Sequence, residues 1–203
     1  MLYALCDYIT EGGRKMAKRK KVYVLWLVVL VSLMSVCLLM LSGCSSPPKT
    51  LDRSISGPQV IVNPETIRLG IAKLAKKTDI VFEGAGFKPG DSVLITLVGP
   101  NETKVIAAEG PIQTDGTFKA RVGPLTKVME ILRGDITFND KFENIIVISQ
   151  APIPKGIYTA KVTSMLSKLT AETKLTVKGP TLIDSVTDWL GKVTGKIQYK
   201  EKK

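Results

Sequence analysis

Hydrophobic and polar residues alternate over much of residues 59–178, in short runs rich in β-branched side chains with turn residues between them. Alternation of this kind indicates strands with one buried and one exposed face, because successive side chains of a strand point to opposite sides. The pattern predicts strands at residues 59–63, 67–72, 79–83, 92–98, 104–109, 117–122, 145–149, 156–164 and 171–178. Short strands at this spacing favour a mainly β fold, an antiparallel β-sandwich.

Turn residues separate several of these runs. Pro89 fixes one backbone dihedral, and Gly90 can adopt the positive φ that a type II turn requires. Asp115 and Gly116 form a strong hairpin signal between two apolar positions. We therefore expect tight turns before the strand at residues 92–98 and before the strand at residues 117–122.

Residues 123–144 depart from the alternating pattern, and we expect an insertion in the sandwich there. Apolar residues recur within it at helical spacing: Leu125, Val128, Met129 and Leu132. They predict a short helix that caps an open end of the sandwich; a binding role is the alternative, because loops on rigid scaffolds often carry function. The polar residues that follow are Asp135, Asn139, Asp140 and Glu143. Their spacing is not that of an EF-hand, which favours a solvated acidic loop over a calcium site.

The end of the chain, residues 179–203, changes from a strand pattern to a helix pattern. Pro180 ends the last strand, and apolar residues at helical spacing predict a helix over residues 181–193. Its apolar stripe consists of Leu182, Ile183, Val186, Trp189, Leu190 and Val193. A basic tail follows, with Lys196, Lys200, Lys202 and Lys203. We expect the stripe to pack on the sandwich; the alternative, contact with a membrane or a partner, is favoured by Trp189 and the basic tail.

The beginning of the chain is an apolar block behind a basic cluster. Residues 18–21 are Lys-Arg-Lys-Lys, residues 22–41 carry no charge, and residues 41–44 are Leu-Ser-Gly-Cys. This order is typical of a secretory signal peptide, here residues 1–43. The alternative is an uncleaved transmembrane helix, since about 20 apolar residues can span a bilayer. Both place the rest of the chain outside the cytoplasm, because the basic cluster stays inside.

The four residues Leu41, Ser42, Gly43 and Cys44 resemble the lipobox of bacterial lipoproteins. The resemblance implies that a dedicated peptidase cuts before Cys44, that its sulfur receives diacylglycerol, and that the new amine is acylated. Fatty acids such as palmitate would then anchor the protein in a membrane. Ser45 follows the cysteine where an aspartate commonly retains lipoproteins at the inner membrane, which implies the outer membrane in a Gram-negative cell.

Two further boundaries follow from the N-terminal pattern. Met16 stands directly before the basic cluster, so we expect translation to begin there, with residues 1–15 as an upstream extension. Residues 44–58 are rich in Ser, Pro and Gly and are expected to form a lipidated flexible tether. The folded domain would then cover residues 59–178, with the insertion inside it.

Several stretches of the domain resemble bacterial immunoglobulin-like surface domains. Residues 83–97 (EGAGFKPGDSVLITL) resemble their turn-and-strand motif, and residues 114–122 (TDGTFKARV) resemble a D-x-x-G-x-F strand. Residues 154–164 and 171–177 resemble their last two strands. The resemblance implies an immunoglobulin-like β-sandwich that serves as a spacer, an adhesin or a complex subunit. The cysteine–tryptophan core of antibody domains is missing, since neither Trp26 nor Trp189 lies in the sandwich.

The charge composition of the chain indicates which classes of partner it favours. Of 29 Lys and Arg and 18 Asp and Glu, six bases and two acids precede residue 44, which leaves residues 44–203 with a net charge of +7. A basic surface favours anionic partners such as lipid head groups or envelope polymers, although a solvated lysine surface without a partner is the simpler interpretation. No basic stripe interleaved with aromatic residues indicates nucleic acid.

The sequence offers few residues and motifs that could support catalysis. The chain has no histidine, which excludes Ser-His-Asp and Cys-His catalysis and imidazole zinc sites. Cys6 and Cys37 precede the cleavage point, so Cys44 is the only cysteine left and no internal disulfide can form. No cofactor-binding motif is present.

These features predict a non-catalytic, membrane-anchored lipoprotein of the cell envelope, without catalytic, cofactor or metal residues. Its immunoglobulin-like domain would bind or space other envelope components. The alternative is a structural subunit of an envelope or secretion assembly, with other envelope proteins as partners. A third hypothesis is an envelope enzyme that uses carboxylates.

Overall fold

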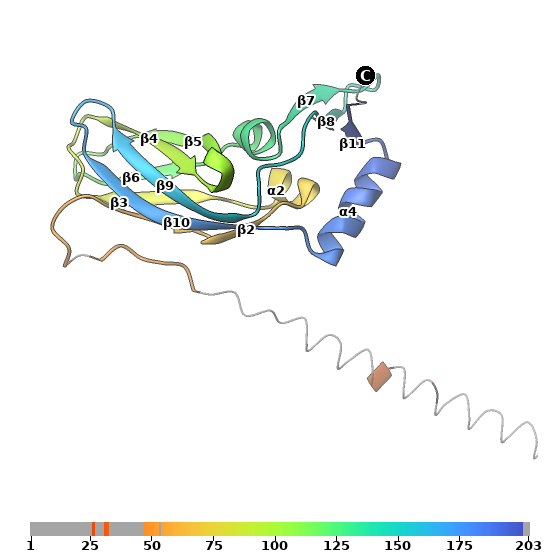
Figure 1. The fold of residues 1–203 in the computed structure, drawn as a ribbon, viewed down its shortest axis with the longest axis horizontal. Helices are drawn as coiled ribbons and strands as arrows, with labels where there is room; N and C mark the ends of the chain where they lie inside the picture. The colour runs from red at the N-terminus through yellow and green to blue at the C-terminus, as the bar shows by residue number, and fades with distance from the viewer. Residues whose placement is uncertain (1–25, 27–30, 33–46, 53, 201–203) are drawn as a thin grey trace, which may run out of the picture. The chain divides into compact units, whose positions relative to one another are not determined.

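The computed structural model describes residues 26, 31–32, 47–52 and 54–200 (Figure 1). The chain divides into two compact units, Met1–Pro47 and Pro48–Lys203. In the first unit, Trp26, Val31 and Ser32 are helical. The remainder of the expected signal peptide, Met16 and the Leu41–Cys44 motif lie outside the described residues. Among the described residues, no helix is both long and apolar enough to cross a membrane.

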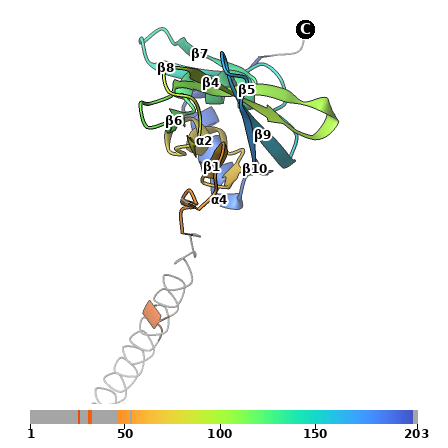
Figure 2. The ribbon, with the colours of Figure 1, turned by 90° about the vertical axis from the view of Figure 1, so that its left-hand side faces the viewer.

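Two sheets face each other in the second unit (Figure 1, Figure 2). The smaller sheet has the order β1 (Gln59–Asn63), β3 (Val81–Ala85) and β6 (Phe118–Arg121). The larger sheet has the order β2 (Thr66–Arg68), β10 (Thr170–Lys178), β9 (Gly156–Ser164), β4 (Ser92–Val98) and β5 (Lys104–Pro111). Neighbouring strands are antiparallel, except that β2 runs parallel to β10. The prediction of a mainly β, immunoglobulin-like sandwich is confirmed.

The alternating pattern places every second side chain of a strand in the core. Val93, Ile95 and Leu97 of β4 are buried, as is Phe82 of the facing β3. Among the described residues, the buried hydrophobic ones all lie between Val60 and Ile197, within the second unit. Because Pro48–Lys203 contains this whole core, we expect it to fold without the first unit.

The turn before β4 has the predicted geometry. Gly90 has a φ of 78°, the left-handed region that a side chain disfavours. At the next predicted turn, Gly116 has a φ of 77°, and Asp115 Oδ1 accepts hydrogen bonds from the amide and the hydroxyl of Thr117. Both turn predictions are confirmed.

Tyr158 connects the start of β9 to the preceding loop. Its ring is fully buried, and its hydroxyl donates a hydrogen bond to the Pro154 carbonyl oxygen at 2.8 Å. Burial raises the pKa of Tyr158, so the hydroxyl remains a donor at neutral pH. A tyrosine that bonds backbone a few residues upstream is a recurring feature of immunoglobulin-like sandwiches.

We expect Tyr158→Phe to lower the free energy of unfolding by about 1–3 kcal/mol, because the Pro154 carbonyl loses its partner inside the protein. Urea unfolding of Pro48–Lys203 measures this change. Tyr199→Phe is a control, since Tyr199 is half-exposed. Equal stability of wild type and Tyr158→Phe would show that the buried hydrogen bond contributes nothing.

The predicted strand at residues 67–72 is wrong over its second half. Only Thr66–Arg68 forms a strand, and helix α2 (Ile71–Lys76) begins three residues later. Ile71, Leu74 and Ala75 are buried at helical spacing. The sequence missed this helix because its first residues also fit a strand pattern.

A third sheet, which the sequence did not predict, begins within the insertion. It has the order β11 (Ile197–Tyr199), β8 (Asn144–Ile148) and β7 (Gly134–Phe138). The strand expected at residues 145–149 is therefore present, but it pairs here and not in the sandwich. β11 runs parallel to β8, so the C-terminal segment pairs with residues that directly follow the insertion.

The predicted helical segment of the insertion is confirmed, although its buried face differs in part. α3 (Pro124–Thr126) continues into the π-helical turn η2 (Lys127–Ile131). Val128, Ile131 and Leu132 are buried, whereas Leu125 and Met129 are exposed. The Lys127 ammonium is also buried and donates to the Thr78 carbonyl oxygen at 2.8 Å; burial lowers the pKa of Lys127.

The described part of the expected tether lies along β1. The Lys49 amide donates to Asn63 Oδ1 at 2.9 Å, and the Asp52 amide donates to Gln59 Oε1 at 3.0 Å. Gln59 returns a hydrogen bond to the Asp52 carbonyl at 2.7 Å. Side chains of β1 thus bind the backbone of these residues, and the flexibility expected of the tether stays a prediction.

Candidate functional site

The C-terminal helix α4 (Leu182–Val193) begins where the sequence predicted it. Thr181 caps the helix: its side-chain oxygen accepts from the Asp184 amide at 3.1 Å, and its own amide donates to Asp184 Oδ2 at 2.9 Å. This reciprocal arrangement is a capping box, which satisfies two amides that have no partner within the helix. Figure 1 shows α4 beside α2, at the end of the second unit that carries the third sheet.

The acidic side chains of α4 hold it on α2. The two carboxylate oxygens of Asp188 accept hydrogen bonds from the Ile71 and Ala72 amides, each at 2.9 Å. These amides form the N-terminus of α2, where Gly70 supplies no side-chain cap. A carboxylate there satisfies free donors and interacts favourably with the helix dipole.

Asp184 makes a second contact with the same helix. Its carboxylate is 4% exposed and lies 3.7 Å from the Lys73 ammonium. The backbone comes so close that a Cβ on Gly70 would lie 2.7 Å from the Asp184 Cβ. The two helices therefore approach each other at a position where only glycine fits.

Electrostatics favour the ionised form of Asp184. Burial by itself would raise the pKa of Asp184, but hydrogen bonds with Thr181 and the nearby positive charges of Lys73 and Arg68 lower this pKa below its ordinary value. The stability that the carboxylate contributes is present above its ordinary pKa and is lost as the pH falls through the lowered pKa.

The apolar stripe of α4 faces away from the protein. Its six side chains are 49–88% exposed: Leu182, Ile183, Val186, Trp189, Leu190 and Val193. The side of α4 against the protein carries Asp184, Asp188 and Gly191, and a Cβ on Gly191 would collide with Ile197 of β11. The expectation that the stripe packs on the sandwich is therefore wrong, because the acids occupy the inner face.

Positive charge surrounds the C-terminal end of the stripe. The Lys192 ammonium lies 4.0 Å from the centre of the Tyr199 ring, a cation–π contact. Lys196 and Lys200 are also exposed. Lys202 and Lys203 lie outside the described residues. A small, mostly apolar hollow of about 210 Å³ adjoins Leu190, between α4, α2 and the third sheet.

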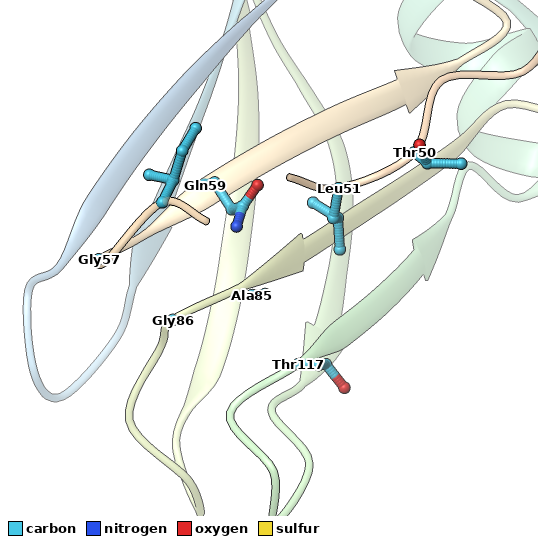
Figure 3. Close-up of a pocket in the computed structure, with 8 residues that line it drawn as sticks. Thr50, Leu51, Gly57, Gln59, Ala85, Gly86 and Thr117 are labelled. Carbon is cyan, nitrogen blue, oxygen red and sulfur yellow. The ribbon is translucent and has the colours of Figure 1, made fainter. Parts of the chain in front are cut away.

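A larger hollow of about 490 Å³ lies between the tether and the smaller sheet (Figure 3). Its lining consists of Thr50, Leu51, Ile55, Gly57, Gln59, Ala85, Gly86 and Thr117. The lining carries no charged side chain, and the Gln59 amide is engaged by the Asp52 backbone. The polar side chains of the lining are therefore all neutral, namely the Thr50 and Thr117 hydroxyls and the Gln59 amide.

The acidic loop of the insertion forms the β7–β8 turn. Asn139 Oδ1 accepts hydrogen bonds from the Lys141 and Glu143 amides, both at 2.9 Å, and the Asn139 side-chain amide donates to Glu143 Oε2 at 3.2 Å. Asp135 Oδ2 accepts from Ser149 at 3.4 Å, and Asp140 is exposed. Within residues 26, 31–32, 47–52 and 54–200, no cluster of three or more Cys, Asp or Glu groups could hold a metal ion.

Another buried carboxylate, that of Asp91, has a structural role that sequence reasoning missed. It accepts hydrogen bonds from the amides of Ser92, Leu166 and Ser167 and from the Ser167 hydroxyl, at 2.7–3.2 Å. Burial by itself would raise the pKa of Asp91, but these four donors hold the pKa well below its ordinary value. The carboxylate joins the turn before β4 to the β9–β10 loop.

Comparisons with known proteins give little beyond a distant likeness. No model of a known protein family matches the chain, and no curated protein matches it. Among solved structures, the chain is similar to macromomycin, with 16% identity and a TM-score of 0.33 over 60% of this chain and 99% of the other. It is also similar to a bacterial immunoglobulin-like domain from the M. primoryensis ice-binding adhesin, with 12% identity and a TM-score of 0.30 over 62% and 97%. Neither similarity indicates what this chain binds.

The order of strands in its two facing sheets makes the second unit an immunoglobulin-like sandwich, and its helix α4 presents an apolar stripe outward. Sequence reasoning identified the stripe of α4 but not the acids that orient it. The signal available was the position of Asp184 and Asp188, four residues apart and therefore on one face of the helix, opposite the stripe.

We expect Asp188→Ala to lower the free energy of unfolding by about 1 kcal/mol, because α2 loses its N-terminal cap. Thermal unfolding of Pro48–Lys203 measures the change. Ser185→Ala is the matched control, since Ser185 is exposed on the same helix and its replacement should leave stability nearly unchanged. If both variants unfold at the same temperature, Asp188 does not hold α4 on α2.

Proposed function

We propose that this chain is a non-catalytic lipoprotein of the cell envelope. In this proposal residues 1–43 are removed as a signal peptide, and Cys44 carries the lipid that anchors the domain outside the cytoplasm, at the outer membrane in a Gram-negative cell. The observation that carries the proposal is the order of the sequence: a basic cluster, an uncharged segment at residues 22–41, then Leu-Ser-Gly-Cys. Two or more acyl chains on one cysteine would anchor the protein stably.

The immunoglobulin-like module would bind or space envelope components. Support for a non-catalytic role comes from the buried carboxylates: hydrogen bonds engage both Asp91 and Asp184, and Asp184 also forms an ion pair with Lys73. A general acid or base needs an oxygen free to meet a substrate, which neither carboxylate offers. These two buried carboxylates therefore give no support to the hypothesis of an envelope enzyme that uses carboxylates.

The second candidate function is a structural subunit of an envelope or secretion assembly. The observation that favours it is the β7–β8 hairpin, where Phe138 and Phe142 are 65% and 88% exposed. Exposed aromatic side chains are enriched in protein interfaces. Affinity purification from detergent-solubilised envelopes, with Phe142→Ser as the comparison, tests this candidate: partners recovered in fixed ratio only with the wild type favour a subunit.

We expect Cys44→Ala to abolish lipid attachment and to leave an uncleaved precursor, because the thioether cannot form without the thiol. Mass spectrometry of protein from a bacterial host, with membrane fractionation, measures both effects. Cys37→Ala is the control, since it removes a thiol within the leader and should leave processing intact. A wild-type protein with an unmodified Cys44, recovered from the cytosol, would overturn the proposal.

A further inference from the structure

We infer that the outward face of α4 is a second membrane contact, which lies along the surface of an anionic phospholipid bilayer. This contact goes beyond the lipid on Cys44, because it belongs to the folded unit and needs no modification. It depends on the proposed function in one respect only: the lipid on Cys44 brings the domain to a membrane. Three features of α4 support this contact: the apolar stripe, the charges around it and the hydrogen bonds that orient the helix.

The stripe has the form of an interfacial helix. Twelve residues give α4 a length of about 18 Å at 1.5 Å per residue, too short to span a bilayer but suited to lying in its interface. Trp189 lies within the stripe, and tryptophan favours the membrane–water boundary because its ring is apolar and its N–H is polar. The remaining side chains of the stripe are aliphatic and would enter the acyl region.

The charges around the stripe match anionic head groups. Between residues 181 and 200 the only acids are Asp184 and Asp188, and both point inward to α2. The three bases of that segment, Lys192, Lys196 and Lys200, are exposed. The outward surface of this segment therefore presents apolar and cationic groups without a competing carboxylate, which anionic lipids attract.

The same charges argue against a second copy of the chain as the occupant. A symmetric pair would bring two identical stripes together, and neither copy would offer a carboxylate from this segment to the lysines of the other. An anionic bilayer supplies both missing elements, an apolar layer for the stripe and phosphates for the lysines.

The orientation of α4 in the folded protein favours binding to a membrane. An amphipathic helix that is unfolded in solution must order its backbone when it binds a membrane. In α4 the capping box, the Asp188 hydrogen bonds and the Asp184–Lys73 pair already fix the helix with its apolar side outward. The membrane therefore binds a preformed surface, which lowers the cost of association.

The experiment uses unlipidated Pro48–Lys203, in which Trp189 is the only tryptophan because the other is Trp26. Vesicles of phosphatidylcholine with phosphatidylglycerol, and of phosphatidylcholine alone, are mixed with the protein and recovered by flotation. We expect binding to the anionic vesicles, quenching of Trp189 by brominated acyl chains, and weaker binding to the neutral vesicles. Salt should reduce the binding, since it screens the lysines.

Two substitutions separate the stripe from general charge. Val186→Glu places a carboxylate in the stripe and should weaken binding at least about tenfold, because tenfold corresponds to about 1.4 kcal/mol and burying a valine gains at least that much. Leu166→Glu adds the same charge at an exposed position of the β9–β10 loop and should bind like the wild type. Val193→Glu, also exposed in the stripe, replaces Val186→Glu if that variant unfolds.

Three results would overturn the inference: no binding of the wild type to anionic vesicles, equal binding of Val186→Glu and Leu166→Glu, or dimerisation that Val186→Glu abolishes while vesicles remain unbound. The last result would identify a second copy as the occupant. Because the tested protein lacks Cys44, its failure leaves the lipid anchor untouched, and failure of lipidation in the host leaves this contact untouched.

Discussion

The pair of hydrogen bonds between the Asp188 carboxylate and the first amides of α2 determines how the C-terminal part of this molecule is arranged. They join residues 117 and 116 positions apart in the chain. With Asp184 they turn the polar side of α4 inward, and the apolar side must then face outward because the two sides are opposite. An amphipathic helix on a globular protein ordinarily has the reverse orientation.

This orientation can be understood by comparing the two alternatives. Rotating α4 would bury its stripe, which is favourable because apolar surface leaves water. It would also remove the cap of α2 and the partners of the buried Asp184 carboxylate, and a charged group that is buried without partners is strongly unfavourable. Without a partner for the stripe, the observed orientation exposes apolar surface to water. Contact with a bilayer removes that cost, because the stripe leaves water while Asp184 and Asp188 keep their partners.

Strict alternation made most of the sandwich predictable. The strands Gln59–Asn63, Ser92–Val98 and Gly156–Ser164 coincide with their predicted bounds, because each has one buried and one exposed face. α2 was missed because its N-terminus is capped from α4, far away in the sequence. β11 was missed because three residues give too short a pattern, and its pairing with β8 is non-local. Likewise, the sequence of α4 showed which side is apolar, whereas what each side contacts depends on the rest of the fold.

An outward-facing stripe requires that Trp189 is in water when no membrane is present. Acrylamide quenching of its fluorescence in Pro48–Lys203, compared with the same protein in denaturant, measures this exposure. A folded protein whose Trp189 is quenched almost as readily as in denaturant is the expected result, in keeping with its 59% exposure. Strong protection of Trp189 in the folded monomer would contradict the account, because it would mean that the stripe packs against the protein.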